Sequence, residues 1–169
     1  MLTERLSQAL NEQVNAELYS AYLYLSMSMY LESIDMSGAA GWMNAQAREE
    51  VSHAERIMGY LNDRGARVWM KAIEEPPAKW DSALQVFEES FEHERKVSAM
   101  IDHLVDLARE ENDHMTENFL QWFVAEQIEE EASVSDVVRL FKLSGDDGGN
   151  LLMIDQKLGE RAAGALEED

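Results

Sequence analysis

Four long stretches of the chain place apolar residues at the spacing of an α-helix. These stretches cover residues 4–33, 39–65, 81–111 and 114–143, and a shorter amphipathic segment follows near 150–161. At about 1.5 Å per residue, each long stretch predicts a helix roughly 40 Å in length. Strand signals are absent, and the 169 residues include only 9 Gly and 2 Pro. The pattern therefore predicts an all-α fold, built as a bundle of long helices.

The connections between these segments predict how the helices run. Ser33–Gly38 and the Asn112-Asp113 break are short, so the helices that each joins should be antiparallel neighbours. The connection Arg67–Trp80 is different, because Pro76-Pro77 forbids helix there. At about 3.3 Å per residue this connection can cross roughly 45 Å. We therefore expect the second and third helices to lie parallel, joined by one long crossover, within a single domain over residues 1–169.

The balance of charges narrows the choice of partners. With 34 acidic and 14 basic side chains, the chain has a net charge of -20. Nucleic acid is not an expected partner, because phosphates need a basic surface. The chain has no cysteine, which excludes disulfides, thiolate zinc sites and cysteine-ligated iron–sulfur clusters. Cations are the natural partners, and any metal ion must be bound by oxygen and imidazole ligands.

The sequence also bears on the location of the protein. The amino terminus, Met1 to Leu6, lacks the basic-then-apolar pattern of a signal peptide. The most apolar stretch, Ala21 to Leu31, is interrupted by serine and too short to span a bilayer. We therefore expect a cytoplasmic protein with no membrane partner.

A glutamate interrupts the apolar stripe near the middle of each long helix. Glu17, Glu50, Glu94 and Glu130 stand where core residues belong, and no lysine or arginine occupies these four positions. An unpaired carboxylate in a dry core is costly, so four of them need compensation. Two divalent cations would balance four ionised carboxylates. His53 follows Glu50 by three residues, which places both on one helical face where they can bind one ion together.

Other interpretations of these residues stay open. The four glutamates can instead be protonated, paired with arginines or turned to solvent. Tyr24 follows Glu17 by two helical turns. Its hydroxyl either approaches the metal ions, where the ring can donate an electron, or hydrogen-bonds a carboxylate as an ordinary core tyrosine. His93, His103 and His114 are interpreted as surface residues and not as ligands. Ligands of this kind suit iron, manganese or zinc better than copper(I).

With these residues assembled, the chain resembles the non-haem ferritins of bacteria and archaea over essentially its whole length. The matching motifs are Asn15-Ala16-Glu17 with Tyr24, the run Glu49 to Ala54, Glu94, and the run Phe119 to Glu131. The resemblance implies a ferritin-like antiparallel four-helix bundle over about residues 4–143. It also implies one long crossover and a short fifth C-terminal helix over about residues 150–161.

The resemblance further implies roles for the site residues. The residues implied to act in the reaction are Glu17, Glu50, His53, Glu94, Glu130, Tyr24 and Gln127. Glu17, Glu50 and His53 would bind the first iron, and Glu50 would bridge to the second. Glu94 and Glu130 would bind the second iron, with Gln127 hydrogen-bonding nearby.

A third iron site and the absence of haem also follow from the resemblance. Glu49, Glu126, Glu129 and Glu130 match the additional iron site of bacterial ferritins. The alternative for Glu49, Glu126 and Glu129 is a solvated acidic face. A bacterioferritin would have methionine beside the bridging glutamate and a second Glu-x-x-His motif on the fourth helix. This chain has Val51 in place of that methionine, and it lacks the second motif. We therefore expect iron and no haem.

These points lead to one expected function and two alternatives. We expect a ferroxidase and iron-storage protein that oxidises Fe(II) with dioxygen or peroxide and keeps the Fe(III) as a hydrous oxide. By resemblance, the mineral would lie inside a homo-oligomeric cage of about 24 subunits. The first alternative is a non-catalytic acidic metal buffer. The second is a di-iron oxygenase that acts on an organic substrate.

Overall fold

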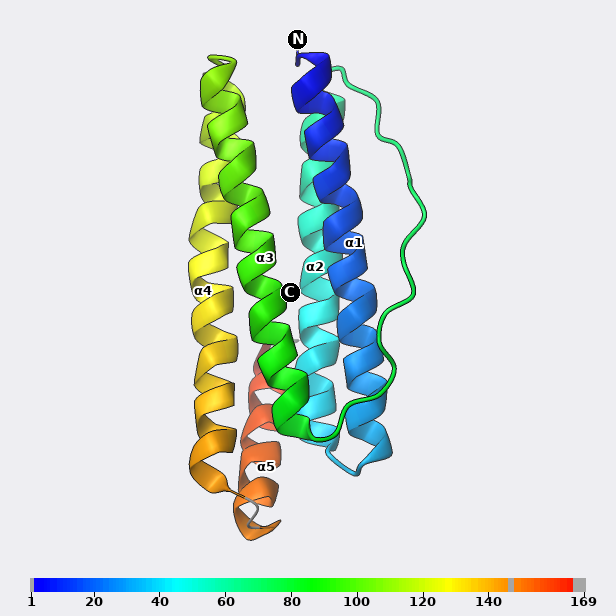
Figure 1. The fold of residues 1–169 in the computed structure, drawn as a ribbon, viewed down its shortest axis with the longest axis vertical. Helices are drawn as coiled ribbons and strands as arrows, with labels where there is room; N and C mark the ends of the chain where they lie inside the picture. Colours follow the sequence, from blue (N-terminus) through cyan, green and yellow to red (C-terminus); the bar gives the residue numbers. More distant parts are fainter. Residues whose placement is uncertain (1, 146–147, 166–169) are drawn as a thin grey trace.

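Four long helices lie side by side, and a shorter fifth helix packs at one end of them (Figure 1). This computed structural model describes residues 2–145 and 148–165. The helices are α1 (Glu4–Ser33), α2 (Ser37–Asp63), α3 (Ala83–Glu110), α4 (His114–Ser144) and α5 (Gly148–Ala165). Within these ranges there is no strand. The predicted all-α fold is therefore confirmed, with helix ends within four residues of the predicted ones.

Left-handed residues make the two tight turns. Asp35 has a φ of 60° between α1 and α2, and Asn112 has a φ of 56° between α3 and α4. Short polar side chains tolerate this conformation better than most residues. Asp113 then caps α4, because its carboxylate accepts a hydrogen bond from the Thr116 backbone N–H at 3.0 Å. Each turn thus reverses the chain within a few residues and makes an antiparallel helical hairpin.

The crossover from α2 to α3 runs along the outside of the bundle beside α1 (Figure 1). Helix α2 ends at Asp63, two residues before the end that the sequence pattern predicts. The chain leaves the helix through Gly65, which has a φ of 71°. Asn11 of α1 then fixes the chain, since its amide donates to the Arg67 carbonyl at 3.1 Å and its Oδ1 accepts from the Trp69 backbone N–H at 2.7 Å. Further along, the Ser26 hydroxyl donates to the Pro77 carbonyl at 2.6 Å. The crossover predicted from Pro76-Pro77 is thus confirmed, and it is hydrogen-bonded to α1.

The core consists of two hydrophobic clusters, one toward each end of the bundle. One cluster contains Met27, Leu31 and Phe87. The other contains Leu10 and Ile57. In sequence, the four central glutamates fall between the members of these two clusters on every long helix. Polar side chains therefore occupy a middle layer with apolar packing above and below, which shields that layer from water at both ends.

Helix α5 packs against α2 and α4 and caps the exposed start of α2. Met36, which precedes α2, makes no side-chain capping bond. Instead, the Asp155 carboxylate of α5 accepts from the backbone N–H groups of Gly38 at 3.1 Å and Ala39 at 2.8 Å. The approach is so close that a Cβ atom on Gly38 would lie 1.8 Å from the Asp155 carbonyl oxygen. A glycine is therefore required where α5 meets α2.

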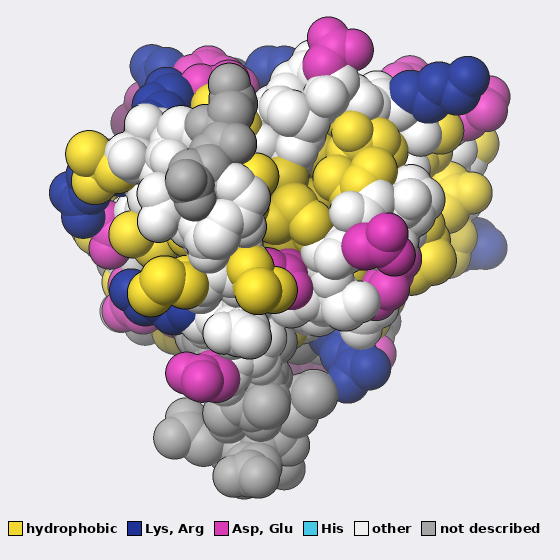
Figure 2. Space-filling view, turned by 90° about the horizontal axis from the view of Figure 1, so that it is seen from below, with side chains coloured by type: hydrophobic (Ala, Val, Ile, Leu, Met, Phe, Trp, Pro, Cys, Tyr) yellow, Lys and Arg dark blue, Asp and Glu magenta, His cyan; other side chains and the backbone are white. Residues whose placement is uncertain are grey.

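The end of the bundle around α5 exposes hydrophobic side chains (Figure 2). Ile154 and Leu158 are buried against the rest of the subunit, whereas Leu152 and Met153 are 59% and 69% exposed. A cleft of about 650 Å³ separates α5 from the start of α3, with Leu84 among its lining residues. The short C-terminal segment is therefore an ordered part of the subunit with its own apolar outer face.

An ion pair at the opposite end gives a first testable prediction. Arg64 donates to the Asp113 carboxylate at 2.7 and 3.2 Å, which holds the pKa of that carboxyl below its usual value. We expect Arg64→Met to lower the free energy of unfolding by about 1–3 kcal/mol at pH 7. Because the folded pKa is depressed, this contribution is present above the unfolded value of about 4 and is lost as pH falls through the folded value.

Urea unfolding of both proteins between pH 7 and about pH 2 measures this effect, since the difference between the two curves should shrink in acid to what the Arg64 bonds to Tyr60 and Thr116 contribute. Arg139→Met is the matched control, because Arg139 pairs with Asp136 at 2.9 Å but both side chains are exposed. A stability difference for Arg64→Met that stays constant across this range would contradict the assignment to Asp113.

Candidate metal centre

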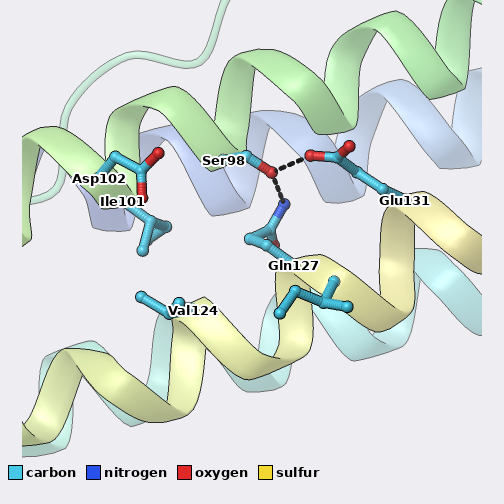
Figure 3. Close-up of a pocket in the computed structure, with 7 residues that line it drawn as sticks. Ser98, Ile101, Asp102, Val124, Gln127 and Glu131 are labelled. Carbon is cyan, nitrogen blue, oxygen red and sulfur yellow. Dashed lines mark hydrogen bonds between the residues drawn. The ribbon is translucent and has the colours of Figure 1, made fainter.

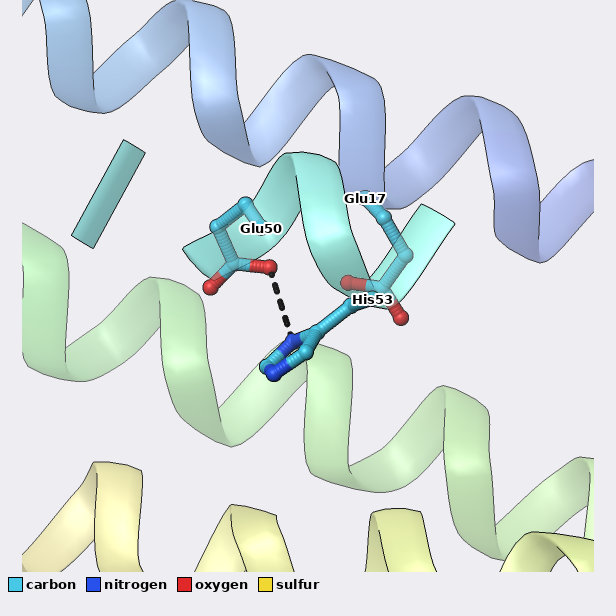
Figure 4. Close-up of side chains that lie close together, drawn as sticks. All are labelled: Glu17, Glu50 and His53. Atoms are coloured by element: carbon cyan, nitrogen blue, oxygen red, sulfur yellow. Dashed lines mark ion pairs between the residues drawn. The ribbon is translucent and has the colours of Figure 1, made fainter. Parts of the chain in front are cut away.

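Two adjacent helices bring three ligand-type side chains together in the middle layer. Glu17 comes from α1, and Glu50 and His53 come from successive turns of α2 (Figure 4). One ligand atom from each lies within 4.8 Å of the other two. All three side chains are at most 2% exposed. The grouping of Glu17, Glu50 and His53 expected from the sequence is therefore what the fold produces, and its dimensions suit one metal ion.

Two carboxylate oxygens in this group have no hydrogen-bond donor. Glu17 Oε1 accepts from the Gln13 amide at 2.9 Å, but Glu17 Oε2 is buried without a partner. Glu50 Oε2 is likewise without a hydrogen bond, although it lies 3.4 Å from His53 Nδ1. Buried polar atoms in folded proteins nearly always have partners, so two unpartnered oxygens in one small group need an explanation. A bound cation would give both of them a partner.

The other two central glutamates come from the second hairpin and are hydrogen-bonded by neutral side chains. Glu94 of α3 accepts from the Tyr24 hydroxyl and, at 3.1 Å, from the Gln127 amide. Glu130 of α4 accepts from the Gln46 amide at 2.7 Å. Both glutamates are at most 5% exposed. The fold therefore brings all four carboxylates into the middle layer, but it groups only Glu17 and Glu50 closely with His53.

Burial and the charges of neighbouring carboxylates raise the pKa values of three of these carboxyl groups, Glu50, Glu94 and Glu130. Burial is the largest influence on Glu50 and raises its pKa well above the usual value, and the charges of Glu17 and Glu94 add to it. Burial also raises the pKa of Glu94. Glu130 reaches a pKa of about 9 through burial and then the nearby charge of Glu49. In the metal-free protein Glu130 is therefore protonated at neutral pH, as one of the alternative interpretations of these glutamates predicts. Binding of two divalent cations would displace such protons and balance the charge.

Tyr24 and His93 form a small group beside Glu94. Tyr24 is 1% exposed, and burial together with the charge of Glu94 raises its pKa well above the usual value, so its hydroxyl stays protonated. His93 packs edge-on against Tyr24 at 5.9 Å between ring centroids and lies 2.8 Å from the Ser20 hydroxyl. Burial lowers the pKa of His93 to about 4. His93 is half-buried, so it is less exposed than the surface position expected from the sequence. A contact between α1 and α3, which only the fold specifies, explains the difference.

A second acidic group lies beside the first, on the side of α2 and α4. Glu49, His53 and Glu126 bring one ligand atom each within 4.8 Å of the others. Glu49 is exposed and Glu126 is half-buried, and the charges of both act on Glu130. Glu129 is exposed and is not part of this close group. Of the residues expected at the third iron site, the fold thus groups Glu49 and Glu126 with His53, and Glu129 stands apart.

Sequence reasoning missed two donors to the central carboxylates. Gln13 precedes Glu17 by one helical turn, a spacing at which an amide and a carboxylate meet. Gln46 lies on α2 one turn before Glu50, but it donates to Glu130 on α4. The signal for Gln13 was present in the sequence. For Gln46 it was only a polar residue on an apolar stripe, because its partner is on another helix.

Comparison with known proteins agrees with this geometry. The family model of the ferritin-like domain matches residues 7–144 of this chain. A bacterial non-heme ferritin of Bacteroides fragilis is 45% identical over 161 residues, which cover 95% of this chain and 100% of that protein. One from Campylobacter jejuni is 40% identical over 156 residues, covering 92% and 93% of the two chains.

Solved structures point the same way. A crystal structure of an open-pore ferritin from the archaeon Archaeoglobus fulgidus superposes with a TM-score of 0.93 at 48% identity, covering 94% of this chain and 98% of that one. In the part of this chain that the structure describes, no helix is long and apolar enough to cross a membrane. The helices that the structure describes have the architecture of that ferritin. The family model and the relatives also cover most of this chain. The chain belongs to the ferritin family.

Proposed function

We propose that the protein is a ferroxidase that stores iron. The observation that supports this most directly is the group of Glu17, Glu50 and His53, with two buried carboxylate oxygens that have no donor. Names of relatives as bacterial non-heme ferritins agree with the proposal. Carboxylate oxygens with one imidazole bind Fe(II) and favour Fe(III) still more, which makes oxidation easier.

The proposed reaction uses both halves of the middle layer. Glu17, Glu50 and His53 would bind the first Fe(II), and Glu94 with Glu130 would bind the second through oxygen lone pairs that their hydrogen bonds to Gln127 and Gln46 leave free. Glu50 bridges the two ions. Each Fe(II) gives one electron to dioxygen, which takes up two protons and leaves as hydrogen peroxide. Tyr24 would orient Glu94 through the hydrogen bond that its hydroxyl donates to that carboxylate.

Storage requires a closed compartment for the Fe(III) product. We propose a homo-oligomeric cage of about 24 subunits in the cytoplasm, in which the ferric ions collect as a hydrous oxide. The net charge of -20 attracts Fe(II) to the protein. The exposed Leu152 and Met153 of α5 give the subunit an apolar surface that another copy can cover.

Anaerobic titration with Fe(II), followed by oxygen and monitored in the ultraviolet, tests the ferroxidase. The expected result is rapid oxidation of about two Fe(II) per subunit, followed by continued turnover as iron is added. Binding without rapid oxidation would identify a metal buffer. Oxidation that stops after one round would identify an oxygenase that lacks its organic substrate. Light scattering during iron loading then tests storage, because a cage keeps the iron soluble.

The second acidic group gives its own prediction. Glu49→Ala with Glu126→Ala should keep rapid oxidation, because neither residue belongs to the proposed pair of iron sites. The double variant should bind fewer tightly held irons per subunit, measured by anaerobic equilibrium titration. Glu55→Ala is the control, since Glu55 is exposed on the same helix as Glu49. Unchanged stoichiometry would mean that Glu49 and Glu126 are a solvated acidic face, and Glu129→Ala decides separately whether Glu129 takes part.

A further inference from the structure

A groove on the α3–α4 face reaches the buried Gln127 from solvent (Figure 3). Its volume is about 320 Å³, and Ser98, Asp102, Gln127 and Glu131 supply its polar lining. Gln127 is only 6% exposed, whereas Glu131 is half-buried and Asp102 is exposed. This face of α4 is separate from the one on which Glu126 meets α2. The groove is therefore a second place where solvent comes close to the proposed iron site.

A chain of three hydrogen bonds links the groove to the buried Glu94. The Gln127 amide nitrogen donates to Glu94 Oε2 at 3.1 Å and to the Ser98 hydroxyl at 3.3 Å, and it also lies 3.3 Å from the Glu94 backbone carbonyl. The Ser98 hydroxyl donates in turn to Glu131 Oε1 at 2.5 Å. Figure 3 shows Ser98 between Gln127 and Glu131, with both bonds drawn. The chain thus begins at a carboxylate near solvent and ends at a proposed iron ligand.

The carboxylate at the outer end fixes the direction of the whole chain. An ionised carboxylate can only accept, so Glu131 makes the Ser98 hydroxyl its donor. The Ser98 oxygen is then left as an acceptor, which the Gln127 amide nitrogen fills. If the amide turned over, its carbonyl oxygen would face the Glu94 backbone carbonyl, which has no hydrogen to donate. Glu131 and Ser98 therefore add to the contacts with Glu94 that favour this amide orientation.

We propose that Ser98 and Glu131 are positioning residues for the second iron, acting through Gln127 on Glu94. The inference rests on the proposed function, because it assigns to Glu94 the role of an iron ligand. Partners that orient a metal ligand contribute strongly to metal affinity in other proteins. Loss of Ser98 or Glu131 leaves Gln127 held by Glu94 alone, which loosens the amide and weakens the second iron, while the first, bound by Glu17, Glu50 and His53, is unaffected.

The competing explanation is that the groove acts by charge alone. Glu131 and Asp102 both line it, and negative charge near a cation site raises the local cation concentration whatever the hydrogen bonds do. The two explanations differ for conservative substitutions. Glu131→Gln removes the charge but keeps an oxygen that accepts from Ser98. Asp102→Ala removes a charge that has no hydrogen bond to the chain.

The experiment is anaerobic titration of the full-length protein with Co(II), followed by calorimetry and by the visible absorption of the bound ion. For Ser98→Ala and Glu131→Ala, the dissociation constant of the weaker ion should rise about 3- to 10-fold, the equivalent of one hydrogen bond. The stronger ion should bind as in the wild type. Glu131→Gln and Asp102→Ala should stay within about twofold of the wild type. In iron oxidation, KM should rise in the first pair while kcat at saturating Fe(II) is kept.

Three other outcomes would each contradict either this inference or the proposed function. Wild-type affinity in Ser98→Ala and Glu131→Ala would overturn the inference while leaving the ferroxidase intact. Equal losses in Glu131→Gln, Asp102→Ala and Glu131→Ala would show that charge alone acts, and would also overturn it. Wild-type protein that binds no pair of Co(II) ions and oxidises no Fe(II) would instead refute the proposed function.

Discussion

Glu50→Gln should lose the fast phase of iron oxidation, with a rate at least about 100-fold below that of the wild type. Glu50 is proposed to bridge both irons, and an amide is a much poorer ligand than a carboxylate for either ion. The metal-free variant should unfold at the same temperature as the wild type or higher. Glutamine keeps the volume of glutamate and removes the repulsion from Glu17 and Glu94.

Stopped-flow absorbance after mixing with Fe(II) and oxygen measures the first effect, and thermal unfolding of the metal-free proteins measures the second. His53→Ala should lose the fast phase as well, because His53 is proposed to bind the first iron. Glu55→Gln is the control on the same helix, exposed and outside the metal-binding groups. Fast oxidation close to the wild-type rate in both Glu50→Gln and His53→Ala would contradict the assignment of these residues as iron ligands.

Gly38→Ala should detach α5 from the bundle. The added Cβ would lie 1.8 Å from the Asp155 carbonyl oxygen, so α5 must move, and overpacking of this kind typically costs about 1–3 kcal/mol. Because Asp155 also caps α2, the first turn of α2 would lose two hydrogen bonds. The proposed iron ligands lie in the middle layer, so fast oxidation should be kept. The cage should be weakened, and iron should precipitate at loads that the wild type keeps soluble.

The same substitution elsewhere on α2 provides the control. A Cβ on Gly59 would meet no neighbouring atom, so Gly59→Ala should stabilise the protein by about 0.5–1 kcal/mol. Truncation after Gly149 should reproduce the effect of Gly38→Ala. Size and iron solubility are measured by light scattering during loading. A Gly38→Ala protein that forms shells and holds mineral as the wild type does would show that α5 docking is not needed for storage.

The fold was largely predictable, because periodicity and turn residues are local properties of the chain. Asn112-Asp113 and Pro76-Pro77 were enough to predict which helices are antiparallel and where the crossover runs. The contacts that fasten these parts were not predictable. Asn11 binds the crossover, and Asp155 caps a helix more than a hundred positions earlier in the chain. Such bonds depend on which surfaces meet in space, and no spacing in the sequence marks them.

The gathering of buried carboxylates at the candidate site was predictable, but their hydrogen bonds were not. A glutamate on an apolar stripe stands out in the sequence, so Glu17 and Glu130 could be identified. Ser98 and Glu131 lie on different helices and carry no such mark, because serine and glutamate are ordinary residues at half-buried positions. The partial burial of His93 was not predictable for the same reason, since it depends on Tyr24 from another helix.

The division of the bundle into two hairpins has a consequence for how the protein holds together. Glu17 and Glu50 belong to the α1–α2 hairpin, whereas Glu94 and Glu130 belong to the α3–α4 hairpin. Apart from the crossover, no covalent link joins the two hairpins. Two irons bound by glutamates of both hairpins would therefore hold the hairpins together. A chain cut within Arg67–Trp80 would then be a split protein whose fragments reassemble, and iron would tighten their association by mass action.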